Sequence, residues 1–219
     1  GEILFRTKLS ENLFKGLSPW MQKLPGGLIH VNVVGCALFA AISGSSAATV
    51  ATVGKMSIPE LRKRNYPEKI LLGSLAGSGT LGLLIPPSII LIIYGVTVQE
   101  SIAKLFVAGI IPGIMIALIF MSYVILWSLF NKKQMPDIVN QYSFIDKIKR
   151  SGQLIPVIIL ILSVIGSIYT GIATATEAAS LGVVGALILS YFQKSLSWST
   201  FKGSLLGATK TSCMISFIL

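Results

Sequence analysis

Long apolar segments alternate with short charged segments along the chain. No Asp, Glu, Lys or Arg interrupts residues 24–54, 70–99, 105–131 or 151–176. Each run exceeds the roughly 20 apolar residues with which a helix crosses about 30 Å of hydrocarbon. Only 12% of the residues are charged, and the mean hydropathy is +0.80. The pattern predicts an all-α integral membrane protein with several transmembrane helices.

The N-terminal segment is too polar to span a bilayer. Leu4, Leu9, Leu13 and Leu17 recur at near-helical spacing, with four charged residues between them. This periodicity favours an interfacial amphipathic arm helix over residues 1–24. A cytoplasmic loop is the alternative.

The first apolar run is long for a single crossing. As one straight helix, residues 24–54 would extend about 46 Å at about 1.5 Å per residue, and would separate the basic segments on either side. Small residues of poor helix propensity interrupt the run at Ser43-Gly44-Ser45-Ser46. We therefore predict a re-entrant helical hairpin over residues 25–58, with its tip at 43–46 and both flanks in the cytoplasm.

Basic residues lie between the apolar runs, and the net charge is +10. This placement follows the positive-inside rule and shows no basic groove for nucleic acid. It predicts a basic cytoplasmic loop at 59–69, a crossing over 70–99, a returning helix over 100–131 and a second cytoplasmic loop at 132–150. Further crossings follow in 151–219.

The second crossing carries its own interruption. Gly79, Gly82, Pro86 and Pro87 fall in the middle of residues 70–99. Gly tolerates non-helical dihedrals, while Pro removes a donor and clashes with the preceding turn. The sequence thus predicts a broken transmembrane helix, unwound around residues 78–88.

Two helix breaks in one membrane protein expose carbonyl oxygens, which are suitable ligands for a sodium ion, and half-helix ends that attract an anion. Helix packing by small residues is the alternative explanation. The predicted sodium ligands are Ser43, Gly44, Gly79, Thr80 and Gly82. The predicted substrate-binding residues are Ser45, Ser46, Thr49, Pro86 and Pro87.

Other polar residues offer little catalytic chemistry. Glu177 stands near a predicted helix start, where Thr176 could cap; an ion relay or a subunit contact is the alternative. His30 reads as structural, and Cys36 and Cys213 as small buried packing residues. The sequence contains no nucleophile–base arrangement, metal cluster or phosphate loop, so we expect no enzyme.

At these residues the chain resembles the large membrane (M) subunit of tripartite ATP-independent periplasmic (TRAP) transporters along essentially its whole length. The order and spacing of several short motifs together make the resemblance specific. The motifs are His30-Val31-Asn32-Val33, Ile42-Ser43-Gly44-Ser45-Ser46-Ala47-Ala48-Thr49, Ile58-Pro59-Glu60-Leu61-Arg62-Lys63-Arg64-Asn65-Tyr66, Gly79-Thr80-Leu81-Gly82, Ile85-Pro86-Pro87-Ser88, Ile93-Tyr94-Gly95 and Thr176-Glu177-Ala178-Ala179. Ala175 stands where the family commonly has Pro between two threonines.

The resemblance implies an elevator-type transporter of the bacterial inner membrane, built from two inverted repeats. Residues 25–58 and 70–99 would belong to the transport domain, and 151–219 would begin the second repeat in the scaffold. Sodium would drive uptake of an organic acid, such as a sialic acid, a C4-dicarboxylate or another sugar acid. A periplasmic substrate-binding protein and a small four-helix membrane subunit would be partners, within membrane lipid.

The chain starts at Gly1 and stops inside an apolar run, so we expect an internal piece of a longer protein, without the second repeat's hairpin and broken helix. Two other functions compete. One is an ion-coupled carboxylate carrier that needs no binding protein. The other is a non-transporting membrane assembly subunit, which would show no sodium dependence.

Overall fold

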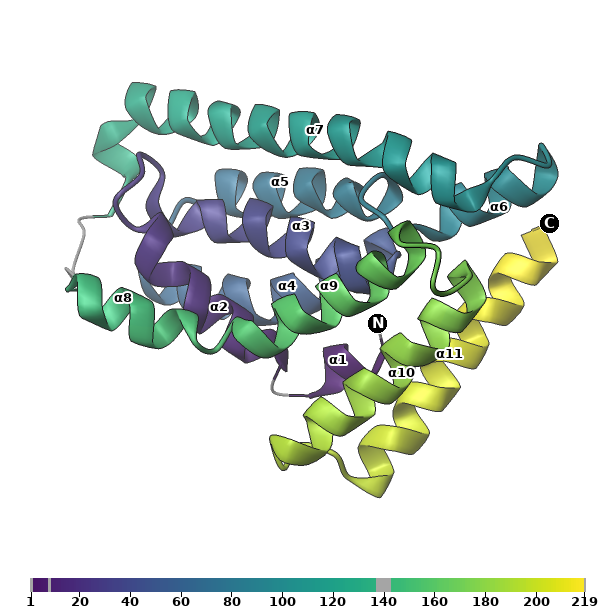
Figure 1. Cartoon of the computed structure of the whole chain (residues 1–219). Helices are drawn as coiled ribbons and strands as arrows, with labels where there is room; N and C mark the ends of the chain where they lie inside the picture. Colours follow the sequence, from purple (N-terminus) through teal and green to yellow (C-terminus); the bar gives the residue numbers. More distant parts are fainter. Residues whose placement is uncertain (1, 8, 137–142, 219) are drawn as a thin grey trace.

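The computed structural model describes residues 2–7, 9–136 and 143–218, and every regular element in them is helical (Figure 1). In chain order the elements are α1 (Glu2–Arg6), α2 (Leu9–Met21), η1 (Gly27–Ile29), α3 (His30–Ser43), α4 (Ser46–Lys63), α5 (Glu68–Gly79), η2 (Thr80–Leu83), α6 (Ile89–Thr97), α7 (Ile102–Phe130), η3 (Lys132–Gln134), α8 (Phe144–Ser151), α9 (Ile155–Tyr169), α10 (Ala175–Phe192) and α11 (Trp198–Ile218).

The predicted hairpin forms from α3 and α4, which pack against each other and against α5. Gly44 ends α3 in the left-handed conformation, with φ of 61°, which glycine adopts without a steric penalty. Ser45 is extended, and its hydroxyl accepts a hydrogen bond from the Ala48 amide at 3.4 Å to cap α4. The Ser-Gly-Ser-Ser segment therefore turns the chain, as predicted.

The predicted broken helix forms from α5 and α6. Helix α5 ends at Gly79 and tightens into η2, where the amides of Leu84 and Ile85 both donate to the Leu81 carbonyl. The chain is then non-helical through Ser88, and the Pro86–Pro87 peptide bond is cis. The prolines cannot donate to a helical ladder, so the interruption falls where the sequence placed it.

The N-terminal arm differs from its prediction in two ways. The arm consists of two helices instead of one. The amide and the hydroxyl of Thr7 both donate hydrogen bonds to the Leu4 carbonyl, and these bonds end α1. Its leucine stripe also packs on protein: Leu4, Leu13 and Leu17 are buried in the main core with residues of the hairpin and of α9.

Both segments predicted as basic cytoplasmic loops contain helix in the part of the chain that the structure describes. Helix α4 continues to Lys63 because good helix formers follow Pro59, supported by an ion pair between Glu60 and Arg64 at 3.5 Å. Non-helical residues remain only at 64–67. In the second segment α8 occupies 144–151, while 137–142 lie outside the described residues.

Two described helices, α7 and α10, are long and apolar enough to cross a membrane by length and composition. Helices α8 and α9 join at a 50° bend and would make a third span if taken together. Helix α11 runs continuously from Trp198, and Lys202 and Lys210 lie within it. A multi-pass membrane protein is therefore supported.

Candidate functional site

The hairpin tip and the helix break meet in space. The Gly44 carbonyl accepts a hydrogen bond from the Ile89 amide at 3.2 Å, which joins the tip to the first residue of α6. A Cβ on Gly44 would lie only 2.6 Å from the Pro87 carbonyl oxygen. The chain can approach this closely only because residue 44 has no side chain.

The glycines of the break face the tip from the other side. A Cβ on Gly82 would lie 2.9 Å from the Ser46 amide nitrogen and 3.1 Å from the Ser45 carbonyl oxygen. A Cβ on Gly79 would collide with the Val50 side chain in α4. The tip and the break therefore pack against each other through Gly44 and Gly82, while Gly79 packs against α4; the binding of an ion by these residues stays a prediction.

Hydroxyl groups line the inner side of the tip. Ser43 Oγ lies 2.9 Å from Thr49 Oγ1 and donates to the Ser45 carbonyl at 3.3 Å. Thr49 is fully buried. Ser46 Oγ is buried and has no hydrogen-bond partner among the described residues. A buried hydroxyl without a partner is costly unless something satisfies it, so Ser46 is the hydroxyl at the tip that is left for a ligand to satisfy.

Thr80 is placed differently from the other predicted ligands. Its side chain is exposed, and its hydroxyl donates to the Gly77 carbonyl at 2.7 Å. Thr80 lines neither of the two cavities at the hairpin tip. Thr80 begins the 3₁₀ turn, and that turn directs its hydroxyl back along α5 instead of toward the tip.

The two prolines of the break have different neighbours, and Pro87 is the one whose carbonyl lies against the tip at Gly44. Pro87 lines an apolar cavity of about 220 Å³ that also involves Leu4, Ile42 and residues of α9 and α10. Pro86 packs near Gly109 of α7. Their visible role is to hold the break open, while a contact with substrate stays a prediction.

Two cavities open at the tip, of about 410 and 390 Å³. Ser45 and Ile89 line both, and so does Thr211 of α11, with Ser212 and Met214 each lining one. The sequence analysis missed α11 as part of this site. The available signal was the group of polar residues Thr209, Thr211 and Ser212, in a helix that also contains Lys202 and Lys210.

Glu177 caps a helix, as the first of the two sequence interpretations had it. Its carboxylate accepts from the Thr174 amide at 2.8 Å and from the Thr174 hydroxyl at 2.7 Å, and the Thr174 hydroxyl accepts from the Glu177 amide. The cap is thus Thr174, whereas Thr176 was expected, because α10 begins at Ala175 and a capping box needs a three-residue spacing.

The remaining polar candidates are structural. His30 is buried, and its Nε2 lies 2.8 Å from the Pro25 carbonyl oxygen. Cys36 is buried as predicted, but Cys213 is exposed, since its side of α11 meets no described neighbour. Among the described residues no three His, Cys, Asp or Glu side chains gather as a metal site. The site at the tip thus offers carbonyl and hydroxyl oxygens, which suit a hard monovalent cation, and hydroxyl groups that can donate to an anion. Glu2, whose carboxylate pairs with Arg6, also lines the cavity of about 410 Å³.

Comparison with known proteins agrees with this architecture. The family described as "Tripartite ATP-independent periplasmic transporter, DctM component" matches residues 1–219. The C4-dicarboxylate TRAP transporter large permease protein of Pseudomonas aeruginosa is 35% identical over 89% of this chain and 45% of its own length. The isethionate TRAP transporter permease of Oleidesulfovibrio alaskensis is 36% identical over 96% of this chain and 33% of its own length.

The sialic acid TRAP transporter permease of Haemophilus influenzae is 32% identical over 96% of this chain and 34% of its own length. The chain therefore spans between a third and a half of these relatives. All three are named as transporter permeases, which agrees with the prediction that the chain is not an enzyme. The chain belongs to the DctM family of tripartite ATP-independent periplasmic transporters.

Proposed function

We propose that this chain forms part of the large membrane subunit of a sodium-driven importer of organic acid anions in a bacterial inner membrane. The observation that carries the proposal is the meeting of two helix breaks, Ser43–Ser46 and Gly79–Ser88, at one polar point. Irregular backbone at membrane depth persists where it lines a binding cavity or the protein interior. Secondary transporters use such discontinuous helices to hold substrate and coupling ion.

In this proposal a sodium ion binds to the Gly44 and Gly82 carbonyls with hydroxyls of the tip. Ser46 is the favoured hydroxyl, because its oxygen is buried without a described partner. Thr80 would have to leave its bond to Gly77 first. The Gly44 carbonyl already accepts from Ile89, and its second lone pair can serve the ion.

The substrate would occupy the adjacent cavities lined by Ser45 and, in this structure, by α11. An ion that fixes the tip against the break also fixes the wall of the substrate cavity. Each ligand then tightens the other by the same factor, which is the linkage that symport requires. Relatives are named for a C4-dicarboxylate, isethionate and sialic acid, so an organic anion is the proposed substrate class.

The complete transporter would work by an elevator movement of the hairpin and the broken helix as one body. A periplasmic binding protein would deliver the substrate and a small membrane subunit would support the scaffold; one relative is named a DctMQ permease. The re-entrant position of the hairpin, with Lys23 and Lys55 on the same side, belongs to this proposal.

The test is uptake by the full transporter in proteoliposomes at varied sodium, with and without the binding protein. Gly82→Ala should disturb the contact with the Ser45–Ser46 backbone and lower sodium and substrate affinity together, by about tenfold each. Gly73→Ala is the matched control, because a Cβ there would meet nothing within 4 Å.

A second pair separates the candidate hydroxyls. Ser46→Ala should raise the sodium concentration for half-maximal uptake about tenfold, and Thr80→Val should change it less than about twofold. Sodium dependence that is unchanged in both Gly82→Ala and Ser46→Ala, in normally inserted protein, would place the ion elsewhere. Uptake without the binding protein would favour the simpler carboxylate carrier instead.

A further inference from the structure

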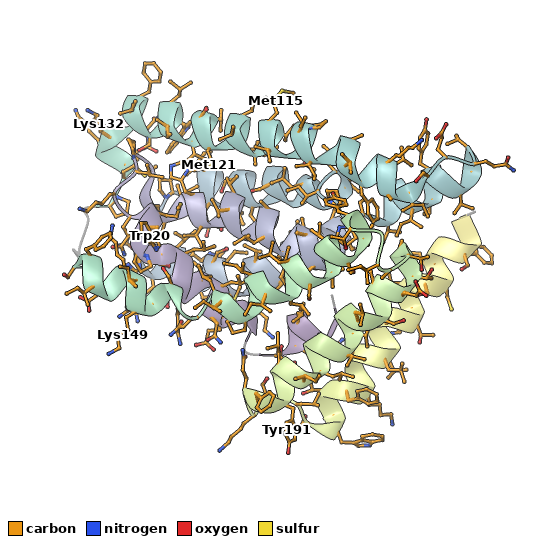
Figure 2. All side chains as sticks on the ribbon, in the orientation of Figure 1. Trp20, Met115, Met121, Lys132, Lys149 and Tyr191 are labelled. Atoms are coloured by element: carbon orange, nitrogen blue, oxygen red, sulfur yellow. The ribbon has the colours of Figure 1, made fainter. Side chains whose placement is uncertain are left out.

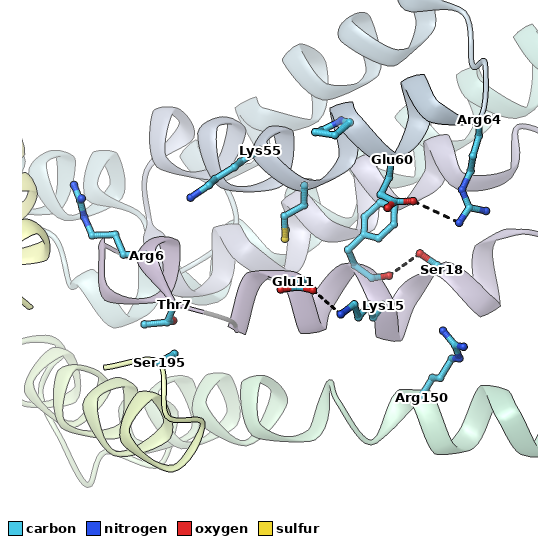
Figure 3. Close-up of a pocket in the computed structure, with 13 residues that line it drawn as sticks. Arg6, Thr7, Glu11, Lys15, Ser18, Lys55, Glu60, Arg64, Arg150 and Ser195 are labelled. Carbon is cyan, nitrogen blue, oxygen red and sulfur yellow. Dashed lines mark hydrogen bonds and ion pairs between the residues drawn. The ribbon is translucent and has the colours of Figure 1, made fainter. Parts of the chain in front are cut away.

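A larger cavity than those at the hairpin tip lies between the arm helices, α4 and α8, among several basic side chains (Figure 3). Its volume is about 710 Å³. Helices α1, α2, α4 and α8 all contribute to its wall, and Ser195, between α10 and α11, completes it. Phe14, Met56 and Pro59 give the wall an apolar part between the charged groups.

The cavity is strongly cationic. Five basic side chains line it: Arg6, Lys15, Lys55, Arg64 and Arg150. Among the described residues two carboxylates line it as well, Glu11 and Glu60, which leaves a formal excess of three positive charges in this lining. Counting Glu2, which pairs with Arg6 outside the lining, the excess is still two. Cations from four segments of the chain therefore converge on a single cavity, a geometry that attracts an anion.

One wall of the cavity bears the marks of a helix in the membrane interface. Trp20 donates from Nε1 to Ser151 Oγ at 2.7 Å, and its ring meets Phe144 edge-on with centroids 6.5 Å apart. Lys147 Nζ stands 5.4 Å over the same indole ring. Trp with one apolar and one polar side, next to Lys, is typical of the headgroup layer of a bilayer.

Helix α8 itself is amphipathic. Ile145 is 75% exposed and Ile148 is 55% exposed on one side, while Arg150 lines the cavity on the other. A short helix with such faces lies along the boundary between headgroups and acyl chains. The cavity at Arg150 therefore lies beside an exposed apolar surface on the same short helix.

From these observations we infer that the cavity binds the headgroup of an anionic phospholipid. The phosphodiester lies among Lys55, Arg64 and Arg150, and the acyl chains follow the apolar face of α8. Basic pockets between helices on the cytoplasmic side are known to suit such headgroups. Because the cavity joins the arm helices to the hairpin, the bound lipid ties the two together. The inference requires only a membrane protein, not the proposed sodium coupling.

The experiment measures lipid binding to the full-length transporter in detergent by native mass spectrometry. The probes are dioctanoyl phosphatidylglycerol, dioctanoyl phosphatidylcholine and glycerol 3-phosphate. We expect the phosphatidylglycerol to bind about tenfold tighter than the phosphatidylcholine and than the chain-free phosphate. Lys55→Gln/Arg150→Gln should weaken phosphatidylglycerol binding about tenfold.

The control is Lys69→Gln/Lys149→Gln, which removes the same charge from exposed residues outside the cavity. The charge-preserving variant Lys55→Arg/Arg150→Lys should bind as the wild type does, which separates lost charge from lost fold. Equal weakening in the Gln pair and its control would overturn the inference. Glycerol 3-phosphate binding as tightly as the lipid would also overturn it, since the ligand would then be a free anion. Transport is not measured, so the result is independent of the proposed function.

Discussion

Helices α3 and α7 are both apolar, but most of α3 is buried in the protein and most of α7 is exposed. Nine of the 14 residues of α3 are buried, including His30 and Asn32, whereas α7 buries only five of its 29. Figure 2 shows Met115 on the outer side of α7 and Met121 on the side toward α3 and α5. The outer residues of α7 include Ile111, 76% exposed. An apolar run alone therefore does not say whether lipid or protein covers it.

The two helices also differ in how they treat polar groups. Helix α3 holds polar side chains inside the protein: Asn32 Nδ2 donates to the Leu71 carbonyl at 3.2 Å and to Ser74 Oγ at 3.0 Å, which ties α3 to α5. The outer side of α7 presents exposed apolar side chains, as a surface that faces lipid does. The position of the hairpin thus depends on contacts within the protein, whereas most of the surface of α7 makes no such contacts among the described residues.

The contrast between α3 and α7 should appear most strongly in the free energy of unfolding after a large-to-small substitution in each helix. Phe39→Ala removes a side chain that is 1% exposed, and should lower the free energy of unfolding by about 4 kcal/mol. Ile111→Ala, on the outer side of α7, should change it by less than about 0.5 kcal/mol. The measurement is a denaturant titration of the purified transporter in detergent. A large cost at Ile111 would show that protein covers that side.

The next effect concerns the polar tie between α3 and α5. Asn32→Ala should cost about 2 kcal/mol, since two buried hydrogen bonds are lost and the partners stay inside. Asn131→Ala is the control in α7; its amide donates to the Trp127 carbonyl at 2.9 Å near the end of the helix, and its loss should cost less than about 1 kcal/mol. Equal costs at both positions would contradict the contrast between the helices.

The smallest effect lies at the entrance to the hairpin. Tyr66 Oη accepts a hydrogen bond from the Leu28 amide at 3.1 Å and connects the loop after α4 to the start of α3. Tyr66→Phe leaves that amide without this acceptor and should cost about 1 kcal/mol in the same titration. A neutral result would mean that another group can serve the Leu28 amide.

Tyr66 also gives this connection a pH dependence. Burial raises the pKa of the Tyr66 phenol above its ordinary value near 10, against smaller opposing effects of the Leu28 amide and Arg64. The folded protein thus favours the neutral phenol, so its stabilisation is complete below about pH 10 and is lost as the pH rises above that value. Tyr66→Phe should remove this part of the alkaline decline in stability. An identical decline in wild type and variant would assign it to other groups.

Much of the fold could be predicted because the chain carries strong local signals. The Ser-Gly-Ser-Ser turn, the Gly- and Pro-rich break and the apolar run of α7 each follow from backbone chemistry within about ten residues. The meeting of the tip with the break was also expected, since unpaired carbonyls at two interruptions need a common interior.

The features that the sequence did not predict correctly have a different cause. Thr80 was expected to face the tip, but the direction of its side chain depends on the 3₁₀ turn that follows α5. The leucine stripe of the arm and the contribution of α11 depend on segments far away in sequence. Charge patterns suggested loops at 59–69 and 132–150, although basic residues are good helix formers. Local pattern thus located the breaks, and only the tertiary structure showed what covers them.

The contact between Gly16 and Leu154 has a consequence for how the protein is made. A Cβ on Gly16 would lie 2.6 Å from Leu154 Cγ, so α2 has a notch that the residue preceding α9 fills. These residues are separated by more than a hundred others, which at about 5–20 residues per second leave the ribosome roughly ten seconds apart. During that interval Leu154 has not yet been synthesised, so the apolar side of α2 that it covers stays exposed on the nascent chain. The packing of α2 in the first half of the chain is therefore completed only when the second half has been inserted.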